Sequence, residues 1–252
     1  MCGFVGIYDP YATFSPSERV SIVKSMGEEL DHRGPDDTGN WGNEIVSLSH
    51  RRLSILDISK AGSQPMFSHC KRFIIAFNGE IYNHNTLREK LEKEYRQSCW
   101  RGNSDTETLL ECLSNWGIEE TLSSLEGMFS FALVDTFNNT LYLARDSFGE
   151  KPLYWGWIDK TIVFCSELQA LNNHPFFVKS LSSPAVINYF QLGYIPSPWS
   201  IYSGIYKLPP SSWLEINGKI PVNPPNKPLT FSSNYDNIKL NKYNKINLNN
   251  VI

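Results

Sequence analysis

The sequence lacks the features that mark a membrane protein, a secreted protein or a nucleic-acid-binding protein. No apolar run in the 252 residues is long enough to span a bilayer. The N-terminus has no basic segment followed by an apolar one, so no signal peptide is predicted. The net charge of −3, with Lys and Arg scattered along the chain, provides no basic patch for nucleic acid or anionic lipid. We therefore expect neither a membrane nor a nucleic acid among the partners.

Cysteine and histidine are also sparse, and neither shows the spacing of a disulfide framework or a metal site. The five cysteines are dispersed without pairs, which predicts reduced thiols and a cytoplasmic protein. The five histidines are equally dispersed, and His32 and His50 are expected to make structural hydrogen bonds. The sequence thus predicts no metal site.

One cysteine is distinguished by its position directly after the initiator methionine. Removal of Met1 would leave Cys2 with a thiol and a free α-amine on one residue. Reference pKa values of about 8.5 for a thiol and about 7.7–8 for an α-amine place both groups near neutral pH. In N-terminal nucleophile catalysis such an amine replaces the histidine of a triad. The alternative is a small residue at a loose terminus, but the apolar alternation from Phe4 predicts a buried strand there.

The apolar pattern along the rest of the chain predicts an α+β fold. Ser15, Pro16 and Glu18 form a helix start, and another capping box is expected at Ser104 and Glu107. A further helix is predicted over 87–95, and a stop is expected at the glycine of position 117. Short strands are predicted over 44–48, 52–56, 72–77, 129–133, 140–145, 153–158 and 161–165. Because hairpins outnumber strand–helix–strand units, we expect antiparallel sheets with helices outside.

Several short motifs follow the N-terminal Cys-Gly in a characteristic order. They are HRGPD at 32–36, RLSILD at 52–57, NGEIYN at 78–83, SDTE at 104–107, RD at 145–146, GEKPLY at 149–154 and SEL at 166–168. In this order the set closely resembles the glutaminase domain of the asparagine synthetases, which are class II glutamine amidotransferases. The resemblance covers roughly residues 2–215.

The resemblance implies both a fold and a reaction. The fold is that of the N-terminal-nucleophile hydrolases, a four-layer αββα sandwich of two antiparallel sheets with the N-terminal strand central. The reaction is hydrolysis of L-glutamine to glutamate and ammonia through a thioester on the N-terminal cysteine. The implied catalytic residues are Cys2, Asn78 and Gly79. The implied substrate-binding residues are Arg52, Leu53, Ser54, Ile55, Leu56, Asn78, Gly79, Glu80 and Asp105.

The chemistry of these side chains suits the implied roles, although each has a plainer interpretation. The side-chain amide of Asn78 and the backbone N–H of Gly79 could stabilise an oxyanion, with glycine allowing close approach or a positive φ. Alternatively, Asn-Gly is a hairpin turn. Arg52 could grip the α-carboxylate of glutamine and Asp105 its α-ammonium. Alternatively, Arg52 is an exposed cation and Asp105 a charge at a helix start.

The composition changes beyond residue 192, and the resemblance suggests why. Residues 2–192 are expected to form the glutaminase domain, and the Pro-rich residues 193–221 resemble the segment that leads toward a synthetase domain. Residues 222–252 are rich in Asn and Lys and are predicted to be disordered. The chain contains no Gly-Gly pair, so the Ser-Gly-Gly-x-Asp-Ser loop of the family's ATP-binding domain is missing. We expect no cofactor on this chain, with ATP and Mg confined to a synthetase domain or a separate synthetase subunit.

Other functions compatible with the sequence are an amidotransferase subunit for a non-aspartate acceptor such as a sugar acid, an inactive remnant or interaction module, and an N-terminal-nucleophile hydrolase for another amide. The intact set of site residues favours the glutaminase.

Overall fold

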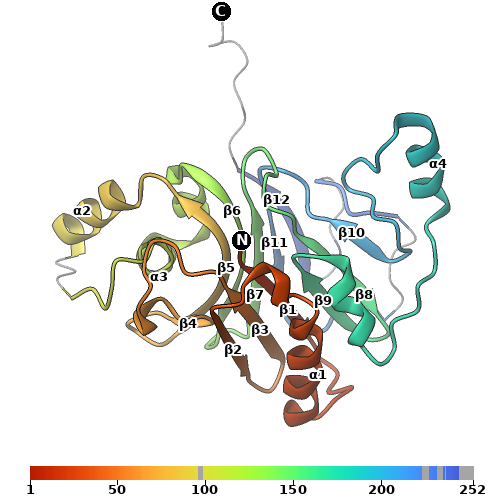
Figure 1. Cartoon of the computed structure of the whole chain (residues 1–252), viewed down its shortest axis with the longest axis horizontal. Coiled ribbons are helices and arrows are strands. Elements are labelled where there is room, and N and C mark those ends of the chain that lie inside the picture. Colours follow the sequence, from red (N-terminus) through yellow and green to blue (C-terminus); the bar gives the residue numbers. More distant parts are fainter. Residues whose placement is uncertain (96–98, 223–226, 232–234, 236, 244–252) are drawn as a thin grey trace, which may run out of the picture.

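The structure is a computed structural model that describes residues 1–95, 99–222, 227–231, 235 and 237–243. Two antiparallel sheets of six strands each lie face to face in it, with helices on the outside (Figure 1). Within the described residues, no helix combines the length and the apolar composition that a membrane crossing would need.

The first sheet holds the N-terminal strand at its centre. Its strands are β1 (Gly3–Tyr8), β2 (Asp37–Gly42), β3 (Val46–Arg52), β8 (Tyr154–Ile158), β9 (Thr161–Cys165) and β10 (Ile205–Lys207). They lie in the order β10-β8-β9-β1-β3-β2. All six residues of β1 are buried because strands cover both of its edges and packed layers cover both of its faces. This burial fixes the start of the chain inside the molecule, as the apolar alternation predicts.

The second sheet is built around the longest strands. Its strands are β4 (Met66–Phe67), β5 (Phe73–Ile81), β6 (Gly127–Asp135), β7 (Thr140–Arg145), β11 (Ser212–Ile216) and β12 (Ile238–Lys242), in the order β12-β11-β7-β6-β5-β4. The predicted hairpin turn between β6 and β7 is confirmed, with Asn139 at a φ of +52°. Strand β4 pairs with only the first part of β5, so the far end of β5 has an open edge.

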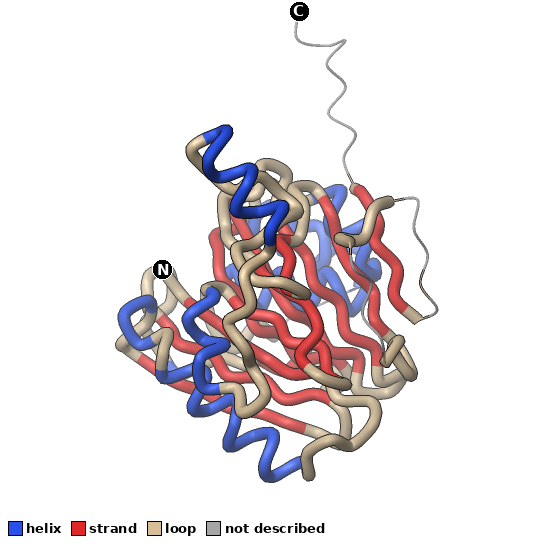
Figure 2. Tube along the Cα trace, turned by 90° about the vertical axis from the view of Figure 1, so that its right-hand side faces the viewer, coloured by secondary structure: helices blue, strands red, loops and turns tan. Residues whose placement is uncertain are grey.

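Helices cover both outer faces of the two sheets (Figure 2). Apolar side chains of the two inner faces, including Phe4, Leu48 and Trp155, pack into a central core. Helix α1 (Pro16–Glu28) buries Val23 and Met26 against the first sheet. Helices α2 (His84–Tyr95) and α3 (Asp105–Ser124) pack on the second sheet, and α4 (Ser183–Leu192) lies at the periphery (Figure 1). The predicted four-layer αββα sandwich is confirmed.

The helix starts agree in part with the sequence predictions. The capping box of α1 is present, since the Ser15 side chain accepts from the Glu18 N–H and Glu18 reaches back to the Ser15 N–H. Ser104 caps α3 through the N–H of Thr106, but Glu107 makes no reciprocal bond. Its carboxylate instead accepts from the backbone N–H groups of residues 101 and 102, so the second capping box was wrong. The glycine at 117, with a φ of +78°, breaks α3 into two helical parts.

Three other predictions differ from the structure. Residues 53–56 leave the sheet after Arg52, so the strand over 52–56 was wrong. The folded domain does not end at residue 192 as expected, because β10 pairs with β8 in the first sheet and β11 pairs with β7 in the second. The prediction of a disordered tail was wrong for Ile238–Lys242, which form β12 and pair with β11. The alternating side chains of Ile238 and Leu240 are buried in the apolar core. The rest of that prediction falls partly on residues 223–226, 232–234, 236 and 244–252, which lie outside the described residues.

Candidate active site

The thiol of Cys2 lies at the point where the first sheet opens toward the second. Strand β1 pairs with β3 so that Gly3 lies opposite Arg51, which brings Cys2 beside the chain leaving β3. Its Sγ accepts from the Leu53 N–H at 3.4 Å and lies 3.6 Å from the Leu53 carbonyl oxygen. Burial raises the pKa of the Cys2 thiol, while the Leu53 backbone hydrogen bond and nearby positive charge, including Arg52, oppose that rise. The thiol therefore contacts the backbone of Leu53 from a half-buried position in the pocket.

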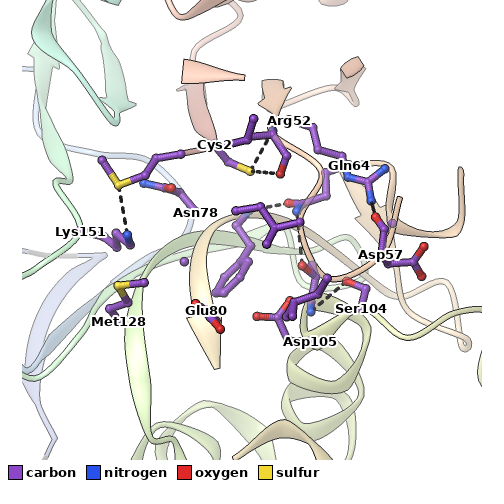
Figure 3. A pocket seen from close by; sticks show the side chains of 18 residues that line it. Cys2, Arg52, Asp57, Gln64, Asn78, Glu80, Ser104, Asp105, Met128 and Lys151 are labelled. Carbon is purple, nitrogen blue, oxygen red and sulfur yellow. Dashed lines mark hydrogen bonds between the residues drawn. The ribbon is translucent and has the colours of Figure 1, made fainter. Parts of the chain in front are cut away.

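Asn78 reaches the same pocket from the opposite sheet (Figure 3). It lies inside β5 rather than in a turn, so the hairpin interpretation was wrong. Because side chains alternate along a strand, Asn78 lies on the same face of β5 as Ile74 and Ala76, which belong to the core between the sheets. Asn78 lies at the end of this core, next to Cys2. The residue is 1% exposed, and its Nδ2 has no hydrogen-bond partner within the described part of the chain. A buried amide donor without a partner is costly, which makes it a candidate for binding a substrate oxygen.

Strand parity shows where the N–H of Gly79 points. The Phe77 N–H donates to Gln64 Oε1 at 2.7 Å, and the Ile81 N–H donates to Asp105 Oδ2 at 2.9 Å, both on the side of β5 away from β6. Backbone groups two residues apart point to the same side of a strand, so the Gly79 N–H faces that open edge between them. It therefore points toward the pocket that Asn78 lines.

Glycine is required at 79 by close approach and not by its dihedral angles. A Cβ there would lie 2.7 Å from the Phe129 Cα of β6, which is shorter than ordinary contacts. Gly79 is not among the residues with positive φ, so that part of the expectation was wrong.

Arg52 ends β3 and turns its guanidinium into the pocket. Its Nη1 donates to the Ser59 carbonyl at 2.9 Å, and its Nη2 donates to the Asp57 carbonyl. The side chain is 7% exposed, so the interpretation as a surface cation was wrong. Two carbonyls orient the guanidinium without neutralising it, which leaves its charge available to an anion.

Asp105 is the first residue of α3 and lies across the pocket from Arg52. Its Oδ2 accepts from the Ile81 N–H, which joins the helix start to the end of β5. Burial raises the pKa of the Asp105 carboxyl to about 6, and the nearby Glu80 contributes to the rise. An ammonium group of a ligand would stabilise a carboxylate in this environment. Asp105 can therefore be both the charge at the start of α3 and a residue that binds the substrate.

The segment after Arg52 is brought to the pocket only in part. Leu53, Ile55 and Leu56 line it, as does Glu80 from β5. Ser54 does not line it, because its N–H donates to Asp36 Oδ2 at 2.7 Å and the residue turns toward the neighbouring loop. The structure therefore gathers every predicted site residue except Ser54 around one cavity of about 120 Å³.

Several residues that line the pocket received no role from the sequence, among them Gln64, Met128 and Lys151. Gln64 holds the edge of β5 and donates from Nε2 to the Thr106 hydroxyl at 3.4 Å. Met128 lies on β6, and Lys151 lies in the GEKPLY motif, where it received no function of its own (Figure 3). Gln64 and Met128 belong to no quoted motif, and only the chain's tertiary course brings them to Cys2.

Hydrogen bonds and an ion pair brace the pocket from outside. Arg33 Nε donates to the Cys2 carbonyl at 2.9 Å, and its Nη1 pairs with Glu167. The Asp146 carboxylate accepts from four backbone N–H groups, those of residues 129, 148, 150 and 151. His32 and His50 make the expected protein hydrogen bonds, to Glu167 and to the Phe77 carbonyl. Among the described residues, no group of three His, Cys, Asp or Glu side chains could hold a metal ion.

Comparison with known proteins identifies the family. A model of the glutamine amidotransferase domain matches residues 1–223. The chain belongs to this family. It is 36% identical over 217 residues to "Asparagine synthetase [glutamine-hydrolyzing] 1" of Bacillus subtilis, covering 86% of this chain and 33% of that protein. It is 33% identical over 232 residues to "Putative asparagine synthetase [glutamine-hydrolyzing] 2" of Methanocaldococcus jannaschii, covering 82% and 42%. The amidotransferase domain thus spans between a third and a half of the length of these relatives.

Solved structures show the same fold at low sequence identity. The domain superposes with a TM-score of 0.65 on the glutamine phosphoribosylpyrophosphate amidotransferase of B. subtilis, at 17% identity, covering 97% of this chain and 50% of that one. A second match, described as the allosteric regulatory enzyme of purine biosynthesis, has a TM-score of 0.63 at 19% identity, covering 97% and 49%. The domain is therefore a class II glutamine amidotransferase domain with the N-terminal-nucleophile hydrolase sandwich.

Proposed function

We propose that the domain hydrolyses L-glutamine to glutamate and ammonia, with Cys2 as the nucleophile after Met1 has been removed. The observation that carries this proposal is the buried, unpartnered Nδ2 of Asn78 facing the same pocket as the Cys2 thiol. A thiol opposite a free amide donor is the arrangement that attack on a carbonyl requires.

The ends of the pocket suit the two charged groups of glutamine. The α-carboxylate binds the Arg52 guanidinium, and the α-ammonium binds Asp105 with help from Glu80. Main-chain groups of Leu53 and Leu56 flank the bound side chain. This orientation directs the side-chain amide of glutamine toward Cys2, and the carbonyl oxygen toward Asn78 and Gly79.

The reaction then needs two acyl-transfer steps. The Cys2 sulfur forms a bond to the amide carbon while its proton passes to the Cys2 α-amine through a water. The Asn78 amide and the Gly79 N–H stabilise the oxyanion, which collapses to a thioester as the protonated amine gives its proton to departing ammonia. Water cleaves the thioester to glutamate. The thiol supplies the nucleophile, the α-amine accepts and returns the proton, and water releases glutamate from the thioester. We therefore propose that this half-reaction uses no cofactor.

The ammonia goes to an acceptor bound elsewhere. The relatives are named as asparagine synthetases, which favours aspartate as that acceptor. The acceptor site lies on a synthetase-type domain or subunit that docks on the amidotransferase domain. An uncharged, exposed apolar face on α4 and the segment after it supports a docking surface there, with Ile187 55%, Phe190 82% and Tyr194 60% exposed.

The experiment that tests the function is a glutamine turnover assay on chain whose N-terminus has been determined by intact mass. Glutamate and ammonia should form in equal amounts, and chelators should not reduce the rate. Cys2→Ala should abolish turnover, whereas Cys70→Ala, which removes an exposed thiol outside the pocket, should not. Absence of turnover by chain with a free Cys2 amine would reject the proposal and favour an inactive interaction module.

A further inference from the structure

Lys151 brings a buried ammonium to the N-terminus of the chain. Its Nζ lies 3.1 Å from Met1 Sδ, and both residues line the pocket with Cys2 and Asn78 (Figure 3). The residue is only 6% exposed. Among the described residues, no carboxylate lies within ion-pair distance of this ammonium. A buried cation without a counter-ion is costly, so its position calls for an explanation.

The backbone around Lys151 is held rigidly in place. Its N–H donates to Asp146 Oδ2 at 2.9 Å, and its carbonyl accepts from Arg145 Nε at 2.8 Å. Asp146 is fully buried, and Arg145 also donates to the carbonyls of Gly149 and Leu208. These bonds fix the backbone of Lys151, from which the side chain extends to line the pocket.

Removal of Met1 would change what Lys151 faces. The thioether that contacts its ammonium would leave, and a new α-amine would appear on Cys2, the residue to which Met1 is joined. An ordinary α-amine, with a pKa of about 7.7–8, is mostly protonated at pH 7 and cannot accept the thiol proton. A neighbouring cation disfavours a second positive charge.

We propose that Lys151 is a positioning residue that keeps the mature Cys2 α-amine neutral at neutral pH, so that the amine acts as the base. This role rests on the proposed glutamine hydrolysis. The step that it supports is transfer of the Cys2 thiol proton to the α-amine nitrogen through water, and the return of that proton to departing ammonia. Lys151 donates no proton in either direction and touches no reacting bond.

Of the other cations near Cys2, Arg52 also disfavours positive charge there, but only until the substrate carboxylate binds it. Arg33 is paired with Glu167, and Arg52 is assigned to the carboxylate of the substrate. The carboxylates of Asp105 and Glu80 favour the protonated form of the amine. The α-ammonium of bound glutamine would neutralise this negative charge. Lys151 is thus the pocket cation with no assigned substrate partner in the described structure.

The test is a titration of the Cys2 α-amine in protein labelled with ¹³C-cysteine, followed by NMR on chain without Met1. Only the N-terminal cysteine carries a titrating amine, and the same signal should be absent from chain that retains Met1. Lys151→Gln should raise the midpoint of this titration by about one pH unit. Lys151→Arg should restore the wild-type midpoint. Lys160→Gln, which removes an exposed charge in the turn between β8 and β9, should leave it unchanged.

The rate should follow the same titration. In Lys151→Gln, kcat/KM for glutamine at pH 7 should fall about tenfold and recover above pH 9. An unchanged amine midpoint in a folded Lys151→Gln variant would overturn the proposal. A loss confined to KM, with an unaltered pH profile, would also overturn it and make Lys151 a substrate contact. The NMR titration needs no turnover, so a failure of the glutaminase function and a failure of this role are distinguishable.

Discussion

The backbone N–H of Leu53 donates a hydrogen bond to Cys2 Sγ at 3.4 Å. This bond ties the second residue of the chain to the first residue beyond β3. A thiolate on Cys2 would gain from the same donor, because N–H groups stabilise the charged form of an acceptor. The contact therefore places the nucleophile and favours its reactive state, against the burial that raises its pKa.

Asn78 should act on the chemical step and not on binding. Asn78→Ala removes the unpartnered Nδ2, so kcat for glutamine hydrolysis should fall by roughly 10²–10³, the usual loss for one oxyanion donor. Steady-state kinetics can measure this. Asn115→Ala, which removes an amide on α3 outside the pocket, serves as the control and should change little. A change in KM alone would show that Asn78 binds the substrate ground state.

Gly62 provides an indirect test of Arg52. A Cβ at position 62 would lie 2.8 Å from Arg52 Cζ, so Gly62→Ala should displace the guanidinium while the strands stay in place. KM for glutamine should rise at least tenfold with a smaller change in kcat, because the α-carboxylate loses its partner. Arg52→Lys should have a similar effect, since an ammonium lacks the planar fork. A wild-type KM in both variants would remove Arg52 from the binding site.

Asp105 should favour substrate binding at a cost in stability. Because burial raises its pKa to about 6, the folded state binds a proton more tightly than the unfolded state. Its charge therefore destabilises the domain above about pH 6, and this penalty disappears as the pH falls through 6 toward 4. Asp105→Asn should increase the free energy of unfolding at pH 7 by about 1–3 kcal/mol and should raise KM for glutamine.

Urea unfolding and kinetics test the two effects of Asp105→Asn separately. In the wild type, kcat/KM should decline below about pH 6 as the carboxylate is protonated. A variant with lower stability and unaltered KM would contradict both statements.

His50 should control part of the acid stability. Burial lowers the pKa of His50 to about 4, below the value near 6.5 that it has when unfolded. Between pH 6.5 and 4 the unfolded state therefore binds more protons than the folded state. The contribution of neutral His50 to the free energy of unfolding is full above pH 6.5 and is lost as the pH falls toward 4. The loss is about 3 kcal/mol at the low end.

Glutamine at position 50 separates titration from hydrogen bonding. His50→Gln keeps a donor for the Phe77 carbonyl but does not titrate, so its free energy of unfolding should depend less steeply on pH between 6.5 and 4. Urea unfolding at several pH values measures this slope. His174, whose pKa burial also lowers to about 4, should retain its share of the dependence. An identical slope in the variant would contradict the assignment.

Local patterns predicted the elements well, and tertiary geometry explains what they missed. The apolar alternation from Phe4 and the cap at Ser15 act over a few residues, so both were visible in the sequence. Arg52 ends a strand instead of starting one, and its side chain bonds to the loop that follows, which periodicity does not encode.

Long-range partners account for the other differences. Gln64 contacts Phe77 and Thr106, which are distant in sequence, so no local pattern identifies it as part of the site. Strand β12 forms from an Asn-rich segment because β11 offers an unpaired edge. The catalytic and binding roles of the gathered residues stay predictions.

The central claim is that a free Cys2 carries the reaction. The most direct measurement is labelling with an electrophilic glutamine analogue of the diazo-ketone type, followed by peptide mapping, on two preparations that differ only in the presence of Met1. We predict stoichiometric label on Cys2, and none on Cys70, Cys99, Cys112 or Cys165, in chain without Met1. We predict neither rapid labelling nor glutamine turnover in chain that retains it. Label on another cysteine, or full turnover with Met1 in place, would contradict the account.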